Sequence, residues 1–387
     1  MPSAIPIPDG EWSLLRASCD SDPRHRQPEF IRSLVSSPIR WKLLFDLSEV
    51  HGLQPLLYQL LSTVQEQVPR EEMHVLAQGY QMNLRKALFL SRELIRIVDR
   101  LQAIGVDVLP YKGVALAEAV YGDIALRQAG DIDLLIHAKD LTRVREALRE
   151  LGYQPHLLLS EPEEHAYLNS GYECAFDSPA GRNLLEVQWA IQPRFYAVDF
   201  DLNAVFQRAI MVPVAGRSMK APCAEDLFLI LSLHAAKHVW GRLIWLSDLA
   251  RIMNLSSVNW DFIASQAKDL GVVRIMRVSL LLANSLLGAQ VPAAAETALP
   301  EDSTAKSWAN RIETQITGGT AHDTESFAYF RLMLQLRESR ADRLRFLTRL
   351  LFTPGPGEWA AIRFPRPLFP LYRLVRLSRL AARLVGA

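Results

Sequence analysis

The chain has 387 residues, of which 49% are hydrophobic and 22% are charged, and its mean hydropathy is +0.05. These are the proportions of a globular protein, which excludes a disordered or fibrous chain, and the length predicts two or three structural units. The cysteines Cys19, Cys174 and Cys223 are odd in number and widely spaced, so we expect neither a disulfide framework nor a cysteine-based zinc site, and a reducing cytoplasm fits best.

Residues 1–104 predict an N-terminal helical region. Apolar side chains recur every three or four residues from Leu84 to Leu101, as on the buried face of an amphipathic helix, and residues 41–61 show a similar pattern that breaks near Gly52 and Pro55. The first twelve residues include two acidic side chains and lack an apolar core, so we do not expect a signal peptide there.

The pattern changes at Gly105, and residues 105–222 predict a compact α/β (α+β) domain. Short apolar runs predict strands over 106–109, 131–136, 172–176 and 184–189, and amphipathic patterns predict helices over 114–121 and 141–151. Residues 178–181 have the composition of a turn that joins the last two strands. Strands alternating with helices and ending in a hairpin indicate a small mixed sheet.

Residues 223–330 predict a helical domain that closes a cleft over the sheet. Helices are expected over 225–239, where acidic residues begin the helix and Lys237 lies near its end, and over 243–254. The longest uncharged helical stretch, 278–295, is interrupted by polar side chains and a proline, so we expect a buried helix with an exit loop and not a membrane span. The polar segment 300–320 is expected to be mostly loop.

Residues 331–387 form an arginine-rich tail of expected amphipathic helices. They contain twelve arginines, no lysine and three acidic residues, so the tail has a formal charge of +9. The rest of the chain has a charge of −8, and the two sum to the net charge of +1. We expect a helix over 327–351, a break at 354–357, and a last helix from Pro370 that bears Arg373, Arg376, Arg379 and Arg383. Three interpretations of this last helix stay open: it covers the acidic body, which we favour, it lies on an anionic membrane, or it binds nucleic acid, which we expect least.

Asp131 and Asp133 are the first candidate site residues. They lie two positions apart in the expected strand 131–136, so both carboxylates point to one side. Two such carboxylates repel each other unless cations lie between them, and Mg²⁺ prefers carboxylate and phosphate oxygens. Glu186 is a third acid, which alternation places on one face of its strand with Gln188. The alternative is that all three are solvated or end their strands, and for Glu186 both interpretations stay open.

Lys112 and Gly113 lie between an expected strand and an expected helix, ahead of the acids. A glycine there lets the backbone approach a phosphate, and the following N–H groups are donors. Lys112 and Arg127 can each neutralise phosphate oxygens, although a solvated surface cation is the favoured interpretation for Arg127 alone.

His234 and His238 lie four residues apart on an expected helix, a spacing that can bind zinc. Position 235 is alanine, so the HExxH pattern is not present and no third ligand is evident, which favours helix-packing or pocket-lining histidines. Trp240 and Trp245 are expected in the core or at an interface, with base stacking left open, and Cys174 is expected to be a buried hydrophobic residue.

Several of these residues carry a resemblance to a known family. They comprise the run Lys112-Gly113-Val114-Ala115-Leu116-Ala117, then Tyr121, Asp123 and Arg127, then Asp131-Ile132-Asp133-Leu134-Leu135. The pattern resembles bacterial proteins of the uncharacterised nucleotidyltransferase family, within the DNA polymerase β-like superfamily. It continues through Glu225-Asp226, His234, Lys237-His238, Trp240, Arg242-Leu243, Trp245-Leu246, Asp248-Leu249-Ala250 and the tail at 365–379. Val114 departs from the serine common in the superfamily, and Glu186 stands where aspartate is commoner.

The resemblance implies a nucleotidyltransferase sheet between N-terminal and C-terminal helical regions, and a two-metal mechanism. Asp131 and Asp133 would hold the Mg²⁺, or Mn²⁺, that binds the triphosphate, and Glu186 would complete the second metal site and help deprotonate the acceptor. The implied contacts to the nucleotide phosphates are Lys112, Gly113, Val114, Arg127, His234, Lys237 and Arg242.

The implied reaction moves a nucleoside monophosphate from an NTP to a hydroxyl of a small molecule or a protein, and releases pyrophosphate. Nucleic acid is not expected as a partner. The alternative is a non-catalytic binding or scaffold protein of the same fold, whose basic helix at 363–387 contacts a membrane surface or a biosynthetic partner. We expect a cytoplasmic protein, with peripheral contact to the inner face of the membrane left open.

Overall fold

A five-stranded mixed sheet positions the acidic residues. The computed structural model describes residues 9–19, 27–178, 181, 184–319 and 326–385, and within them the sheet has the strand order β1-β2-β5-β4-β3. Its strands are β1 (Val108–Pro110), β2 (Asp131–Ile136), β3 (Gln154–Pro155), β4 (Glu173–Asp177) and β5 (Leu184–Gln188). β2 and β5 are parallel and the other neighbours are antiparallel, which confirms the predicted small mixed sheet. The predicted turn at 178–181 and the predictions on residues 1–8 lie partly or wholly outside the described residues.

The alternation of β2 and β5 separates a polar face from an apolar one. Ile132 and Leu134 of β2 pack in one core with Leu185 and Val187 of β5. The parallel register sets Asp133 opposite Glu186. Because successive side chains point to opposite faces, the acids of both strands share the face that the apolar residues leave.

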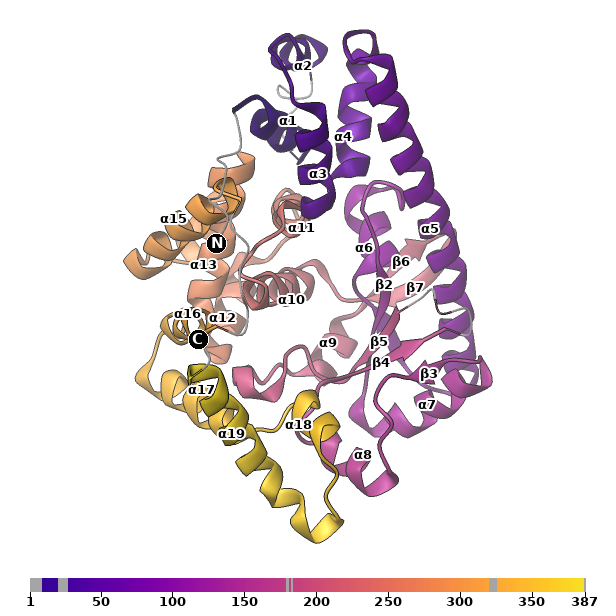
Figure 1. Cartoon of the computed structure of the whole chain (residues 1–387), viewed down its shortest axis with the longest axis vertical. Coiled ribbons are helices and arrows are strands. Elements are labelled where there is room, and N and C mark those ends of the chain that lie inside the picture. The colour runs from indigo at the N-terminus through magenta and orange to yellow at the C-terminus, as the bar shows by residue number, and fades with distance from the viewer. Residues whose placement is uncertain (1–8, 20–26, 179–180, 182–183, 320–325, 386–387) are drawn as a thin grey trace.

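The N-terminal region is helical, as predicted, and leads into one long helix. It contains α1 (Asp9–Cys19), α2 (Pro28–Val35), α3 (Trp41–His51), α4 (Gln54–Leu61), the 3₁₀ helix η2 (Ser62–Gln67) and α5 (Arg70–Ala103). The expected break is Gly52, which ends α3 with a φ of 75°. α5 runs along one side of the molecule and reaches the sheet (Figure 1), where its buried stripe packs behind the strands.

Short helices connect the strands, and one hairpin was not predicted. Between β1 and β2 the chain forms α6 (Gly113–Leu116), which continues as the π-helical turn η3 (Ala117–Tyr121). β2 is followed by η4 (Ala138–Asp140) and α7 (Leu141–Glu150), and β4 is preceded by α8 (Glu161–Leu168). β5 is followed by η5 (Arg194–Tyr196) and α9 (Leu202–Arg208). The hairpin comprises β6 (Ile210–Val214) and β7 (Arg217–Ala221), and its turn residues Ala215 and Gly216 both have positive φ. Most of its side chains are exposed and β6 contains Pro213, which obscures the alternation.

Six helices form the region after the hairpin: α10 (Ala224–Lys237), α11 (Leu243–Met253), α12 (Trp260–Leu270), α13 (Val273–Leu287), α14 (Ala293–Ala298) and α15 (Ser303–Thr317). The prediction of mostly loop over 300–320 is wrong, because α15 occupies it. Asp302 caps this helix by accepting from the N–H of Ala305 at 2.7 Å. Its buried stripe contains alanines as well as Ile312 and Ile316, so a polar composition hides an amphipathic helix. No helix among the described residues is long and apolar enough to cross a membrane.

The expected helix over 327–351 is divided in two, α16 (Phe327–Gln335) and α17 (Arg340–Phe352). Arg337 lies in the break, is almost completely buried, and donates to the carbonyl oxygen of Tyr196 at 2.6 Å. Ser339 caps the second helix by accepting from the N–H of Asp342. The buried guanidinium is thus paired with a carbonyl from another part of the chain, which the periodicity of residues 327–351 does not reveal.

The tail ends in α18 (Pro356–Ala361), the 3₁₀ helix η6 (Arg366–Leu371) and α19 (Tyr372–Val385). α19 packs on α17, and the buried Arg376 donates to the carbonyl oxygen of Leu350 at 3.1 Å. The guanidiniums of Arg376 and Arg379 lie 3.6 Å from the buried carboxylate of Glu358. Part of the positive charge of α19 is therefore used inside the molecule. The side chain of Arg383 lies outside the described residues, and contact with a membrane or nucleic acid stays a prediction.

A buried ion pair joins the sheet to the helical region. Arg127 lies between η3 and β2, and donates from Nε and Nη2 to the two carboxylate oxygens of Asp248 on α11, each at 2.9 Å. The Tyr121 hydroxyl donates to the same carboxylate at 2.8 Å. The two charged side chains are 8% and 1% exposed. The prediction of a solvated surface cation for Arg127 alone is thus wrong, since a distant partner buries it.

Replacing Arg127 should therefore destabilise the fold strongly. We expect Arg127→Met to lower the free energy of unfolding by about 3–5 kcal/mol, because the Asp248 carboxylate then stays buried without a counter-charge. Urea denaturation measures the loss. Arg32→Met is the matched control, because Arg32 pairs with Glu66 on the exposed surface and should cost less than about 1 kcal/mol. Equal losses in the two variants would contradict the role of the buried pair.

Candidate active site

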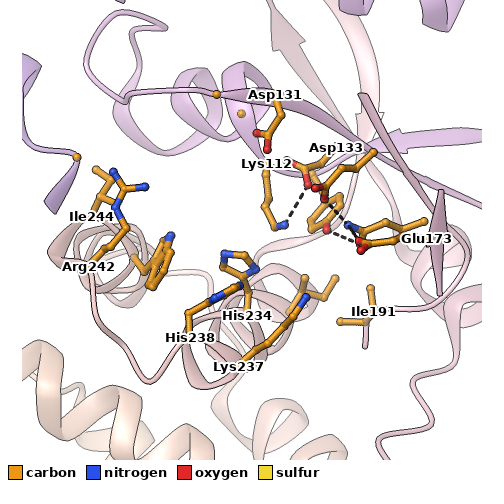
Figure 2. Close-up of a pocket in the computed structure, with 18 of the residues that line it drawn as sticks. Lys112, Asp131, Asp133, Glu173, Ile191, His234, Lys237, His238, Arg242 and Ile244 are labelled. Carbon is orange, nitrogen blue, oxygen red and sulfur yellow. Dashed lines mark hydrogen bonds and ion pairs between the residues drawn. The ribbon is translucent and has the colours of Figure 1, made fainter. Parts of the chain in front are cut away.

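A pocket of about 360 Å³ lies between the polar face of the sheet and the helices α10 and α11. Such a volume is within the range of small-molecule sites. Figure 2 shows Asp131, Asp133, Lys112 and Glu173 on the sheet side, opposite His234, His238, Lys237 and Arg242 on the helical side. The lining also includes Gly52, Tyr111, Gly113, Arg127, Tyr172, Glu186, Gln188, Ile191, Gln192, Ile244 and Trp245.

The structure brings nine of the ten sequence-predicted site residues to this pocket. They are Asp131, Asp133, Glu186, Lys112, Gly113, Arg127, His234, Lys237 and Arg242. Val114 is the exception: its side chain is 2% exposed and packs in the core behind the sheet. That side chain therefore does not face a ligand in the pocket.

The acids form a cluster in which, among the described residues, only Lys112 makes an ion pair with one of the carboxylates. Lys112 Nζ lies 3.0 Å from Asp133 Oδ1, and both side chains are largely buried. Burial and the neighbouring Asp133 raise the pKa of Asp131 to about 6. Burial, Asp133 and Glu173 raise the pKa of Glu186 to about 7. The repulsion makes this cluster a place where additional positive charge is stabilising.

The donor chemistry of the cluster fits a divalent cation. Asp131, Asp133 and Glu186 offer hard carboxylate oxygens on adjacent strands, the ligand type that Mg²⁺ and Mn²⁺ prefer. Across the described ranges, no three His, Cys, Asp or Glu side chains converge on one metal position as they stand. To bind one cation together, the three carboxylates would have to turn toward a common point. Asp133 would then have to contact the cation as well as Lys112.

A second network crosses the pocket, and most of its residues are not among the predicted site residues. Lys237 Nζ donates to the Tyr172 hydroxyl at 2.9 Å, and that hydroxyl donates to Glu173. Gln188 Nε2 donates to Glu173 at 3.3 Å and to Glu186 at 3.1 Å. Burial lowers the pKa of Lys237, and Lys112 adds to this effect, although Glu173 opposes it.

Glu173 is thus a fourth carboxylate of the site. It lies next to Tyr172 in the strand 172–176 that the sequence predicts, so its place in that strand follows from the sequence. The predicted hairpin of strands 172–176 and 184–189 is confirmed as the antiparallel pair β4 and β5. The sequence does not give the register that sets Glu173 opposite Gln188 and brings Glu173 to the pocket.

Two predicted phosphate contacts have structural partners. Arg127 is bound by Asp248, and Arg242 Nε donates to the carbonyl oxygen of Val50 at 2.8 Å. Both line the pocket, but each ties its wall to another element. Their contact with phosphate stays a prediction.

His234 and His238 line the pocket, one of the alternatives that the sequence favours. Burial lowers the pKa of His234 well below its ordinary value and that of His238 to about 4, with nearby lysines adding to the effect. Both imidazoles are therefore neutral at neutral pH. Trp245 also lines the pocket, whereas Trp240 is completely buried. Burial raises the pKa of the Cys174 thiol to about 11, in keeping with a buried hydrophobic role.

Gly113 allows the chain to lie directly against β2. Its φ is +57°, and a Cβ atom there would lie 2.9 Å from the backbone oxygen of Asp131. The glycine is therefore required for the position of the loop that carries Lys112, because any side chain would push this loop away from the acids.

A family model described as "Uncharacterised nucleotidyltransferase" matches residues 37–288. No curated protein sequence matches the chain. Among solved structures, an antigenic nucleotidyltransferase-like protein from Paracoccidioides brasiliensis is 17% identical; the match covers 55% of this chain and 95% of that chain, with a TM-score of 0.30. That TM-score is too low to support any argument about this chain.

Gly113→Ala should cost more than an alanine at another left-handed glycine. We expect a loss of about 1–3 kcal/mol in the free energy of unfolding, from the positive φ and the contact with Asp131 together. Gly122→Ala is the matched control, because Gly122 has a φ of +73° and nothing within 4 Å of an added Cβ. Urea denaturation of both variants separates the two causes, and equal losses would show that the contact with Asp131 is unimportant.

The pH dependence of stability should report the repulsion around Glu186. Glu186 loses its proton at about pH 4.5 in the unfolded chain but only at about pH 7 in the folded protein. Between these two pH values the folded state binds more protons than the unfolded state, so this group lowers the free energy of unfolding as the pH rises. Glu186→Gln should remove this decline and raise the melting temperature at pH 8 by a few degrees. Thermal denaturation from pH 5 to pH 8 tests this. Glu29→Gln, at an exposed position, is the control, and a wild-type slope retained in Glu186→Gln would refute the assignment.

Proposed function

Because the chain belongs to the uncharacterised nucleotidyltransferase family, we propose that it transfers a nucleoside monophosphate from an NTP to a hydroxyl acceptor and releases pyrophosphate. The observation that carries this proposal is the meeting of the acids of β2, β4 and β5 with Lys112 and Lys237 in one pocket. A polyphosphate needs cationic partners, and the transfer needs carboxylates that hold metal and accept a proton.

The lysines are the groups of this chain suited to the phosphates. Burial alone would lower the pKa of Lys112, but Asp133 and Tyr111 raise it overall, so this lysine stays charged. Lys237 reaches the pocket from the opposite wall. A triphosphate between them would meet positive charge from both sides, which favours a bound, extended polyphosphate.

Asp131, Asp133 and Glu186 would hold Mg²⁺ or Mn²⁺. When bound, the metal supplies positive charge to the oxygens that enter and leave the α-phosphorus. Binding would also require Asp131 and Glu186 to release protons, and their raised pKa values place that release near neutral pH.

Glu186 is the proposed general base. In the transfer, the acceptor oxygen forms a bond to the α-phosphorus, the bond from the α-phosphorus to the bridging oxygen of pyrophosphate breaks, and the acceptor proton passes to a carboxylate. The Glu186 carboxylate, which lines the same pocket as the paired aspartates, would accept this proton. Glu173 and Gln192 also line the pocket and offer polar groups to a hydroxylated acceptor, a small molecule or a protein side chain.

Removing the paired carboxylates should abolish turnover. We expect Asp131→Asn/Asp133→Asn to lower pyrophosphate release by at least about a thousandfold. The assay supplies each NTP with Mg²⁺ and a small-molecule and protein extract as the source of acceptor. Asp107→Asn is the control, because Asp107 pairs with Lys220 outside the pocket and should keep wild-type turnover. Unchanged turnover in the double variant would sink the proposed function.

A further inference from the structure

Three aromatic side chains, His234, His238 and Trp245, form one wall of the pocket, which we name the aromatic wall. His234 lies on α10, His238 is the residue that ends this helix, and Trp245 lies on α11. Figure 2 shows the two histidines across the cavity from the carboxylates. We propose that the aromatic wall is the subsite for the nucleobase of the NTP. This inference rests on the proposed function and adds to it the place and the type of contact that recognise the base.

The three rings contact one another and form a continuous aromatic surface. Ring centroids are 4.9 Å apart for His234 and His238, 5.2 Å for His234 and Trp245, and 5.3 Å for His238 and Trp245. Each side chain is only partly buried, so the rings are accessible from the pocket. A planar base can stack on such a surface whatever its identity, because every base has a π-face.

The ring nitrogens of His234, His238 and Trp245 make no hydrogen bond with any residue in the part of the chain that the structure describes. A neutral imidazole has one donor and one acceptor nitrogen, and an indole has one donor. The wall therefore offers both stacking surface and unpaired hydrogen-bonding groups, which is the combination that the exocyclic groups of a base need.

The charge distribution assigns the phosphates to other residues. The two imidazoles are neutral, as described above, whereas the lysines Lys112 and Lys237 lie beside the carboxylates. Arg242, at the far end of the wall, lies 5.9 Å from the Trp245 ring centroid and is bound to the backbone of α3. A polyphosphate is stabilised near the lysines, and a neutral aromatic group is stabilised near the wall.

The backbone that connects the two helices is strained, and the strain fixes the wall. Val239 and Trp240 both have positive φ, 53° and 49°, which is unfavourable for any residue except glycine and most of all for a β-branched one. Trp240 offsets this cost: it is completely buried, its N–H donates to the Ala235 carbonyl at 2.7 Å, and its indole N–H donates to Ser279 at 2.9 Å. The turn thereby sets α11 against α10 and brings Trp245 beside the histidines.

Calorimetry with two ligands tests the inference. The two ligands are the α,β-methylene analogue of each NTP and inorganic tripolyphosphate, each measured with Mg²⁺. The proteins compared are the wild type and the variants Trp245→Leu, Trp245→Phe and Trp308→Leu. We expect Trp245→Leu to weaken binding of the best analogue about tenfold or more, and binding of tripolyphosphate less than twofold. Trp245→Phe keeps an aromatic ring and should stay within about threefold of wild type. Trp308, a partly buried tryptophan on α15 outside the pocket, is the matched control.

The outcomes separate the inference from the proposed function. If Trp245→Leu binds the analogue as wild type does, or loses analogue and tripolyphosphate equally, the aromatic wall is not the base subsite. If wild type binds tripolyphosphate but no variant at Trp245 alters analogue binding, the phosphate site stands and the base subsite does not. If wild type binds neither ligand, the proposed function itself fails, and this inference fails with it.

Discussion

The buried pair of Arg127 and Asp248 is the interaction on which the pocket depends. Arg127 belongs to the segment that leads into the acidic strand β2, and Asp248 belongs to the helix that carries Trp245. Desolvating two charges is unfavourable unless their hydrogen bonds are completed, and here the two-oxygen contact together with the Tyr121 hydroxyl completes those of the carboxylate. The pair thus fixes the distance between the two walls, and with it the space that a ligand can occupy.

Within that space the protein has concentrated unfavourable electrostatics. Four carboxylates from three strands share a largely buried site with two lysines. Burial, together with repulsion between the carboxylates, raises the pKa values of Asp131 and Glu186. A site of this kind is poorly satisfied on its own and is relieved by cations and by ligands that bring them. The left-handed backbone at Val239 and Trp240 is a second local cost, offset by the burial of Trp240. Both costs lie at the pocket, where function and stability compete.

The rigidity of the surroundings makes these costs sustainable. Gly113 lets the Lys112 loop lie against β2, the long helix α5 packs behind the sheet, and the tail contributes a helix whose arginines satisfy the buried Glu358. The site is therefore supported by packing between secondary-structure elements and not by its own loops alone.

The sequence determined the local features and the types of chemistry. Periodicity placed the strand 131–136, the major helices and the shared face of Asp131 and Asp133, because side-chain direction follows directly from a period of 2.0 or 3.6 residues. The same rule failed over 300–320, where buried alanines give a weak hydrophobic signal, and at Arg337, which lies buried in a break between two helices. Only the tertiary structure decided that Arg127 belongs to Asp248, that Glu173 joins the acids, and that Trp245 faces the pocket while Trp240 fills the core. These outcomes depend on which strands pair and which helices pack, and such contacts between remote residues leave no periodic trace in the sequence.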